Sequence, residues 1–125
     1  MQLGAFCLAL AVKDLVVSRA FYETLGFRPA SGAEAKNWLV LRDGGGTTIG
    51  LFQGMFEHNT LTFNPGWDRQ AQPLAQYEDV REIQRALKTG GLTLTVEADE
   101  TTTGPAFLML MDPDNNPILI DQHVG

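Results

Sequence analysis

The stretch "LAVKDLVVSRAFYETLGF", residues 10–27, combines the end of an apolar run, a helix start and a helix stop. Apolar side chains recur in it at helical spacing, at Leu15, Val17, Phe21 and Leu25. This spacing predicts a helix, with Asp14 as its N-cap and Gly26 just past its last turn. The continuously apolar residues 5–12 in front of it predict a strand.

The rest of the chain repeats this order once. Strands are predicted at 27–30, 37–42 and 47–53, and then at 58–64, 92–97, 105–111 and 117–123. A second helix is predicted between residues 79 and 90, with Asp79 as its cap and an apolar stripe at Val80, Ile83 and Leu87. We therefore expect one α+β domain, residues 1–125, made of two βαβββ modules at about 1–55 and 56–125.

The composition excludes several classes of function. The chain has 125 residues, of which 44% are hydrophobic and 19% charged, and its net charge is −6. The negative charge and the scattered basic residues argue against nucleic-acid partners and against binding to anionic membranes. The single cysteine, Cys7, rules out an intrachain disulfide, and the apolar N-terminal stretch is too short to span a bilayer. A cytoplasmic location is expected.

Strand alternation predicts which side chains share a face. Small or polar residues alternate with large aliphatic ones in several strands, as at Cys7, Ala9 and Ala11, at Thr48, Gly50 and Phe52, at Thr60, Thr62 and Asn64, and at Leu119 and Asp121. The aliphatic set is expected under the helices. The small or polar set would then line a cleft between two curved sheets, or simply face solvent.

With the second signature, "DPDNNPILI" at residues 112–120, the chain resembles the vicinal oxygen chelate superfamily, which includes glyoxalase I, bleomycin-resistance proteins and extradiol dioxygenases. The resemblance covers essentially the whole chain. It implies the glyoxalase/bleomycin-resistance fold and a homodimer, but a fold does not specify a reaction.

The resemblance also implies where a divalent metal would bind. The family's ligands, typically two histidines and two glutamates, correspond here to Cys7, a position near Gly50, His58 and Leu119. Of these only His58 is a ligand of the family's type. We therefore expect no metal cofactor at this site, because one imidazole and one thiol do not make a closed donor set. A rearranged metal site using His58, Cys7 and Asp121 is the alternative.

The predicted ligand-binding residues are Cys7, Trp38, Phe52, His58, Thr60, Thr62, Asn64, Trp67, Leu119 and Asp121. His58 is also the predicted catalytic acid or base. For each aromatic residue the competing interpretation is ordinary packing, and for Cys7 it is an inert buried thiol. His123 is expected to be a solvated strand end, since few residues follow it.

Three functions remain open on this basis. The first is a small-molecule-binding protein of the glyoxalase/bleomycin-resistance type that works without a metal. The second is a glyoxalase-like lyase or isomerase that uses either a metal or His58 as base. The third is a structural or regulatory homodimer that binds no ligand.

Overall fold

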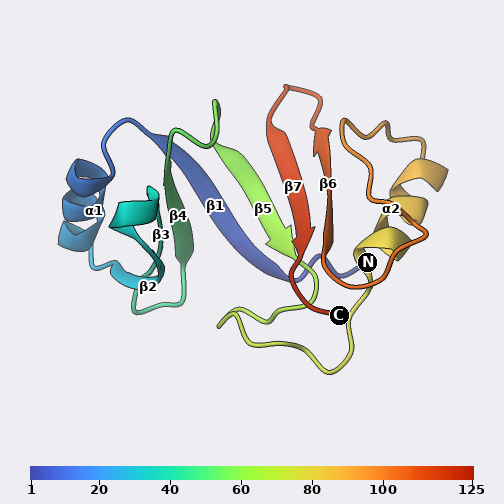
Figure 1. Ribbon diagram of the computed structural model, residues 1–125, viewed down its shortest axis with the longest axis horizontal. Helices are drawn as coiled ribbons and strands as arrows, with labels where there is room; N and C mark the ends of the chain where they lie inside the picture. Colours follow the sequence, from blue (N-terminus) through green and yellow to red (C-terminus); the bar gives the residue numbers. More distant parts are fainter. The chain divides into compact units, whose positions relative to one another are not determined.

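The computed structural model describes residues 1–125 and has a mixed α+β fold (Figure 1). Its elements are β1 (Ala5–Val12), α1 (Leu15–Thr24), β2 (Arg28–Ala33), the 3-10 turn η1 (Glu34–Lys36), β3 (Trp38–Arg42), β4 (Thr48–Gln53), β5 (Thr60–Asn64), α2 (Val80–Thr89), β6 (Ala106–Met111) and β7 (Pro117–Gln122). This confirms the predicted fold class. Neither helix is long and apolar enough to cross a membrane.

The chain forms two compact units. The first unit is Cys7–Thr60, and the second is Met1–Phe6 together with Leu61–Gly125. In the first unit the strands run in the order β2-β3-β4-β1, with β1 and β4 parallel and the other pairs antiparallel. In the second unit the order is β5-β7-β6, with β5 and β7 parallel and β6 and β7 antiparallel.

The core of the first unit lies between α1 and one face of its sheet. It consists of Leu15, Leu39, Leu41, Ile49 and Leu51, with Leu8, Leu10 and Val12 packed against them. Alternation had predicted Leu8, Leu10 and Val12 of β1 and Ile49 and Leu51 of β4 on the helix side, which is confirmed, whereas Phe6, predicted there too, is 46% exposed. Burying a side chain of this kind contributes about 1.5–3 kcal/mol to folding.

Helix α1 begins and ends as predicted but buries a different stripe. Asp14 Oδ1 accepts hydrogen bonds from the amides of Val16 and Val17 at 3.1 and 3.2 Å, which makes it the N-cap. Leu15 is buried, but the rest of the predicted apolar stripe is not: Val17, Phe21 and Leu25 are 64%, 60% and 61% exposed. The inner side of the helix is formed by Leu15 and the half-buried Tyr22, seven residues apart, which is a second helical stripe in the same sequence.

The second unit has its own core between α2 and one face of its sheet. Val80, Ile83, Leu108, Leu110 and Ile120 are buried there, and Leu87 packs against them. The predicted stripe of the second helix is therefore confirmed. Asp79 accepts a hydrogen bond from the amide of Arg81 at 2.9 Å and is the cap, as predicted.

The predicted strand at 92–97 is wrong. Only one isolated bridge forms there, between Val96 and Met109 on the outer edge of β6. The alternating sequence suits a strand, but the segment is largely exposed, and a strand needs a partner along its length. The predicted strand at 58–64 is shorter than expected and begins at Thr60.

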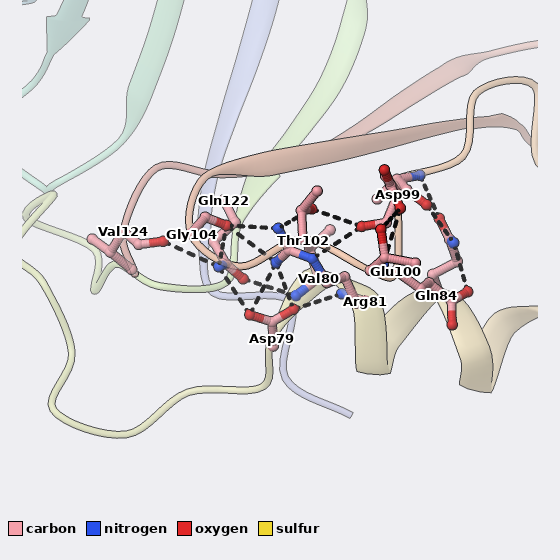
Figure 2. Close-up of polar contacts among 12 residues, drawn as sticks. Asp79, Val80, Arg81, Gln84, Asp99, Glu100, Thr102, Gly104, Gln122 and Val124 are labelled. Carbon is pink, nitrogen blue, oxygen red and sulfur yellow. Dashed lines mark hydrogen bonds and ion pairs between the residues drawn. The ribbon is translucent and has the colours of Figure 1, made fainter.

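The segment 98–104, which follows α2, forms no strand ladder. Hydrogen bonds from side chains of α2 hold it instead (Figure 2). The Arg81 guanidinium, only 5% exposed, donates to the carbonyl oxygen of Gly104 at 3.1 Å and to Thr102 Oγ1 at 2.9 Å. Gln84 exchanges two hydrogen bonds with the backbone of Ala98, at 3.0 and 2.7 Å. These bonds satisfy loop carbonyls and amides that a regular sheet would otherwise pair.

Gln122, the last residue of β7, joins the same network from the sheet side (Figure 2). Its Oε1 accepts from the amide of Val80 at 2.8 Å, and its Nε2 lies 3.1 Å from the carbonyl oxygens of Gly104 and Val124. The side chain is fully buried. The start of α2 and the residues after β7 are therefore tied together.

Candidate functional site

The face of the first unit's sheet that lies opposite α1 carries small and aromatic side chains. Strand register places Trp38 beside Phe52 and Phe52 beside Ala11, and in the next row places Gly50 beside Ala9. Small residues in the middle of a sheet leave room that a larger side chain or a ligand can occupy.

Trp38 and Phe52 form a stacked pair on this face. Their ring centroids are 6.2 Å apart and their planes differ by 5°, and the Phe56 ring meets Phe52 edge-on at 5.0 Å. Both residues of the stacked pair are half-buried, so each keeps some surface exposed. Two of the three predicted aromatic residues are thus together, whereas Trp67 belongs to the second unit.

Gly50 is the position near which the second metal ligand was expected, and its lack of a side chain has a structural consequence. A Cβ added to Gly50 would lie 2.5 Å from Cε2 of Phe52, so the ring lies directly over this glycine. A carboxylate side chain at this position would displace the ring.

The remaining candidates of the first unit are Cys7, His58 and Thr60. Cys7 is half-buried, and its Sγ lies 3.9 Å from the carbonyl oxygen of Leu8. His58 lies in the loop before β5 instead of in the strand, and its side chain is exposed. Its carbonyl oxygen accepts a hydrogen bond from the buried Thr60 hydroxyl at 3.1 Å.

The two parallel strand pairs give a second way to locate the family's ligand positions. Leu8 pairs with Ile49 in the first unit, and Leu61 pairs with Ile118 in the second. Thr60, just before Leu61, is therefore the counterpart of Cys7, just before Leu8. In the same way Leu119 is the counterpart of Gly50. Register thus assigns the third ligand position to Thr60, where the sequence pattern had assigned it to His58.

Neither choice yields a donor set that suits a divalent metal. The four positions hold a thiol, a glycine, a leucine and either an imidazole or a hydroxyl, with no carboxylate. No group of three or more His, Cys, Asp or Glu side chains that could hold a metal lies together in either unit. The residues present do not fit the metal that the family resemblance implies.

The second unit presents the other predicted residues on the face opposite α2. Thr62 pairs with Leu119 there, and the same face continues to Asn64 on β5 and Asp121 on β7. Asn64 is buried, and its Oδ1 accepts from the amide of Gly66 at 3.1 Å. Its Nδ2 has no hydrogen-bond partner within the chain.

Asp121 and His123, which are two residues apart at the end of the last strand and so share a face, are in direct contact. His123 Nε2 lies 2.9 Å from Asp121 Oδ2, and the imidazole meets the Trp67 indole nearly edge-on at 4.7 Å between centroids. The hydrogen bond to Asp121 raises the pKa of His123 more strongly than partial burial lowers it. His123 was expected to be a solvated strand end, but although exposed it is held by two side chains. The two-residue spacing of Asp121 and His123 was the available signal.

Comparison with known proteins identifies the family. The model of the Glyoxalase/Bleomycin resistance protein/Dioxygenase superfamily matches residues 5–120. No curated protein matches the chain. The chain therefore belongs to this superfamily.

Solved structures share the fold at low sequence identity. A Legionella pneumophila structure described as an NAD-dependent benzaldehyde dehydrogenase has a TM-score of 0.69 at 18% identity, with 94% of this chain and 98% of that chain covered. A superfamily member from Vibrio splendidus 12B01 has a TM-score of 0.62 at 16% identity, with 94% and 97% covered. The Mn(II)-bound glyoxalase from Novosphingobium aromaticivorans has a TM-score of 0.54 at 15% identity, with 97% of this chain and 38% of that chain covered.

Proposed function

We propose that this member of the Glyoxalase/Bleomycin resistance protein/Dioxygenase superfamily binds a flat, mainly apolar small molecule without using a metal ion. The observation that carries the proposal is the stacked Trp38–Phe52 pair on the sheet face that α1 leaves uncovered. The adjacent Ala9 and Ala11 have small side chains, and the Phe52 ring lies over Gly50.

The chemistry of this surface favours a planar ligand. Aromatic rings attract one another in offset or edge-on arrangements, each contact being worth about 0.5–1.5 kcal/mol beyond the area buried. Trp38 and Phe52 are already parallel, so a flat ring system could extend the stack without reorganising them. The absence of carboxylates at the family's ligand positions supports binding that depends on these rings instead of on a chelated ion.

A titration with 2-naphthol, a neutral planar probe, tests the proposal. The chain has only two tryptophans, so NMR resolves two indole N–H signals. We expect the Trp38 signal to shift saturably and Trp38→Leu to weaken binding about fivefold, the equivalent of one aromatic contact. Trp67→Leu is the matched control and should leave binding of the probe unchanged. Equal effects of the two variants would rule out the Trp38 surface.

The second part of the proposal is a homodimer formed through the outer side of α1. Val16, Val17, Phe21 and Leu25 are each at least 60% exposed there. Together they make an apolar patch of roughly a few hundred Å², the size at which exposed patches on soluble proteins are often interaction sites. Ala20 and Thr24 lie between them, so no charge interrupts the patch.

A second copy of the chain is the partner that fits this patch. The patch is apolar along a whole helix, so two antiparallel copies related by a two-fold axis would each cover the other's stripe. A stable interface buries about 800 Å² on each partner, so the stripe would be its centre and neighbouring polar residues its rim.

Sedimentation velocity of Phe21→Glu tests the dimer. We expect the wild-type protein to sediment as a dimer and this variant as a monomer, because the glutamate would be buried without a partner. Ala86→Glu, which adds the same charge to the exposed side of α2, is the control and should remain dimeric. A monomeric wild-type protein, or a dimeric Phe21→Glu, would contradict the proposed interface.

A further inference from the structure

We propose that Trp67, Asp121 and His123 form a binding site for small carboxylates on the second unit, with His123 as the group that meets the carboxylate. The site lies on the sheet face opposite α2. It belongs to a different unit from the Trp38–Phe52 surface and does not depend on the function proposed for that surface.

The geometry leaves one side of the imidazole available. Nε2 of His123 is engaged by Asp121 Oδ2 at 2.9 Å, and the ring packs against Trp67. The His123 side chain remains 48% exposed. Nδ1, the other ring nitrogen, is therefore the atom that can reach a ligand. A carboxylate that orients one imidazole nitrogen also fixes the direction in which the other one points.

The residues on both sides of His123 are anchored, so the pair is pre-organised. Gln122 is fully buried in the hydrogen-bond network at the start of α2 (Figure 2). Val124 packs so closely on Gly66 that a Cβ added to that glycine would lie 2.1 Å from Val124 Cγ2. A site whose backbone is already ordered loses less conformational entropy when a ligand binds.

The polar groups of this region favour a ligand rich in hydrogen-bond acceptors. Phe63 on β5 pairs with Ile120 on β7, so the next step along both strands places Asn64 beside Asp121 on the same face. Asn64 Nδ2 is a buried donor without a partner, and its orientation follows from the bond that Oδ1 accepts from Gly66. The Trp67 indole N–H and the second N–H of a protonated His123 are further donors. The Trp67 and His123 rings therefore each bring an N–H donor to the region that holds the one carboxylate, Asp121.

Charge and apolar surroundings narrow the class of ligand. Asp121 is the only charged group that contributes to the raised pKa of His123, and it favours the imidazolium form. An imidazolium donates one hydrogen bond to Asp121 and another to an anion. Leu119 lies on the same face, as does Phe107, which pairs with Asp121 and is 47% exposed. An anion with an apolar body, such as a small aromatic carboxylate, fits both features.

Benzoate is the probe, and NMR of the histidine rings is the measurement. The chain has only two histidines, so the exposed His58 serves as an internal reference. We expect benzoate to shift the His123 signals saturably, to raise the pKa of His123 further, and to leave His58 unchanged. Benzamide, which has the same shape without the charge, should bind about tenfold more weakly.

Variants show whether benzoate binds at His123 or elsewhere on the protein. In the wild type benzoate should also shift the Trp67 indole N–H signal, because that ring packs against His123. His123→Gln should abolish this Trp67 shift in a chain that remains folded by circular dichroism, whereas His58→Gln and Trp38→Leu should bind benzoate like the wild type. Asp121→Asn should lower the pKa of His123 and so move benzoate binding to lower pH. Equal binding of benzoate and benzamide, tighter binding of benzylamine, or unchanged binding by His123→Gln would each overturn the proposal.

Discussion

The two helices of this protein each pack on one face of a sheet, but their solvent-exposed sides differ: that of α1 is apolar and that of α2 is charged. Helix α1 leaves Val17, Phe21 and Leu25 exposed, whereas the exposed side of α2 carries Arg85 and Lys88. On the sides that face the sheets, α2 is the more polar helix. Helix α1 buries the apolar Leu15 there, whereas α2 buries the polar Arg81 and Gln84 beside its aliphatic residues.

The difference reflects which parts of the chain each helix packs against. Helix α1 packs on a sheet of four strands, which satisfies its own backbone. Helix α2 packs on three strands and must also hold 98–104, a segment that has no strand ladder. Polar side chains on α2 therefore satisfy backbone groups that strand pairing satisfies in the first unit.

The largest expected effect comes from removing this polar anchor. Arg81→Ala should lower the free energy of unfolding by about 3–5 kcal/mol, because it removes the hydrogen bonds of a buried guanidinium to Thr102 Oγ1 and to the Gly104 carbonyl oxygen, each worth about 1.5–3 kcal/mol. The ion pair with Asp79 is lost as well. Urea denaturation measures the change. Arg85→Ala is the control, since its ion pair with Glu100 is largely exposed and should be worth less than about 1 kcal/mol. Similar losses for the two variants would mean that burial of Arg81 does not matter.

A second prediction tests which side of α1 carries its stability. Leu15→Ala should cost about 2–5 kcal/mol, because Leu15 is buried against the sheet. Val17→Ala should change the free energy of unfolding by less than about 0.5 kcal/mol when measured on the monomeric Phe21→Glu background. If Val17→Ala were the costlier change there, the stripe predicted from sequence would be the packed one after all.

Asp79, the N-cap of α2, should make part of the stability of this protein sensitive to acid. Burial raises the pKa of Asp79, but hydrogen bonds from the Arg81 amide, Gln122 and the Arg81 guanidinium outweigh it and lower the pKa below its ordinary 3.8. A lowered pKa contributes stability that is complete above 3.8 and lost as the pH falls below it. The wild type should therefore lose part of its stability as the pH falls below 3.8, whereas Asp79→Asn should not show this loss. Acid unfolding of the two proteins measures the difference.

Asp14 provides the matched cap in α1. Asp14→Asn keeps an acceptor oxygen at the cap and should cost well under about 1 kcal/mol at neutral pH. Asp79→Asn should cost more, since it also weakens the bond to a buried arginine. Equal costs at neutral pH would show that the polar network adds nothing to a simple cap.

The smallest expected effect concerns His123. Its raised pKa contributes stability that is complete below the ordinary value of 6.5 and lost as the pH rises through the raised one. Because both side chains are more than a third exposed, Asp121→Asn should change the free energy of unfolding at pH 6 by less than about 1 kcal/mol. NMR titration should still find a lower pKa for His123 in that variant. An unchanged pKa would mean that the pair does not form in solution.

Much of the fold could be predicted because its signals are local. Asp14 and Asp79 cap the helices where the sequence indicated, and the alternation of large and small residues correctly assigned Leu10, Ile49 and Ile120 to the helix side. The candidate site was harder to predict from the sequence. Trp38 and Phe52 could be proposed individually, but their stacking depends on the register of two strands.

Apart from the missing strand at 92–97, the sequence by itself determined the order of strands and helices, the helix ends and the alternating faces, because backbone geometry sets those periods within a few residues. Tertiary structure alone decided which stripe of α1 is buried, that 92–97 forms one bridge instead of a strand, and that His123 packs against Trp67. Each of these depends on which partner is within reach. A partner that is distant in the sequence leaves no periodic signal at the residue that it contacts.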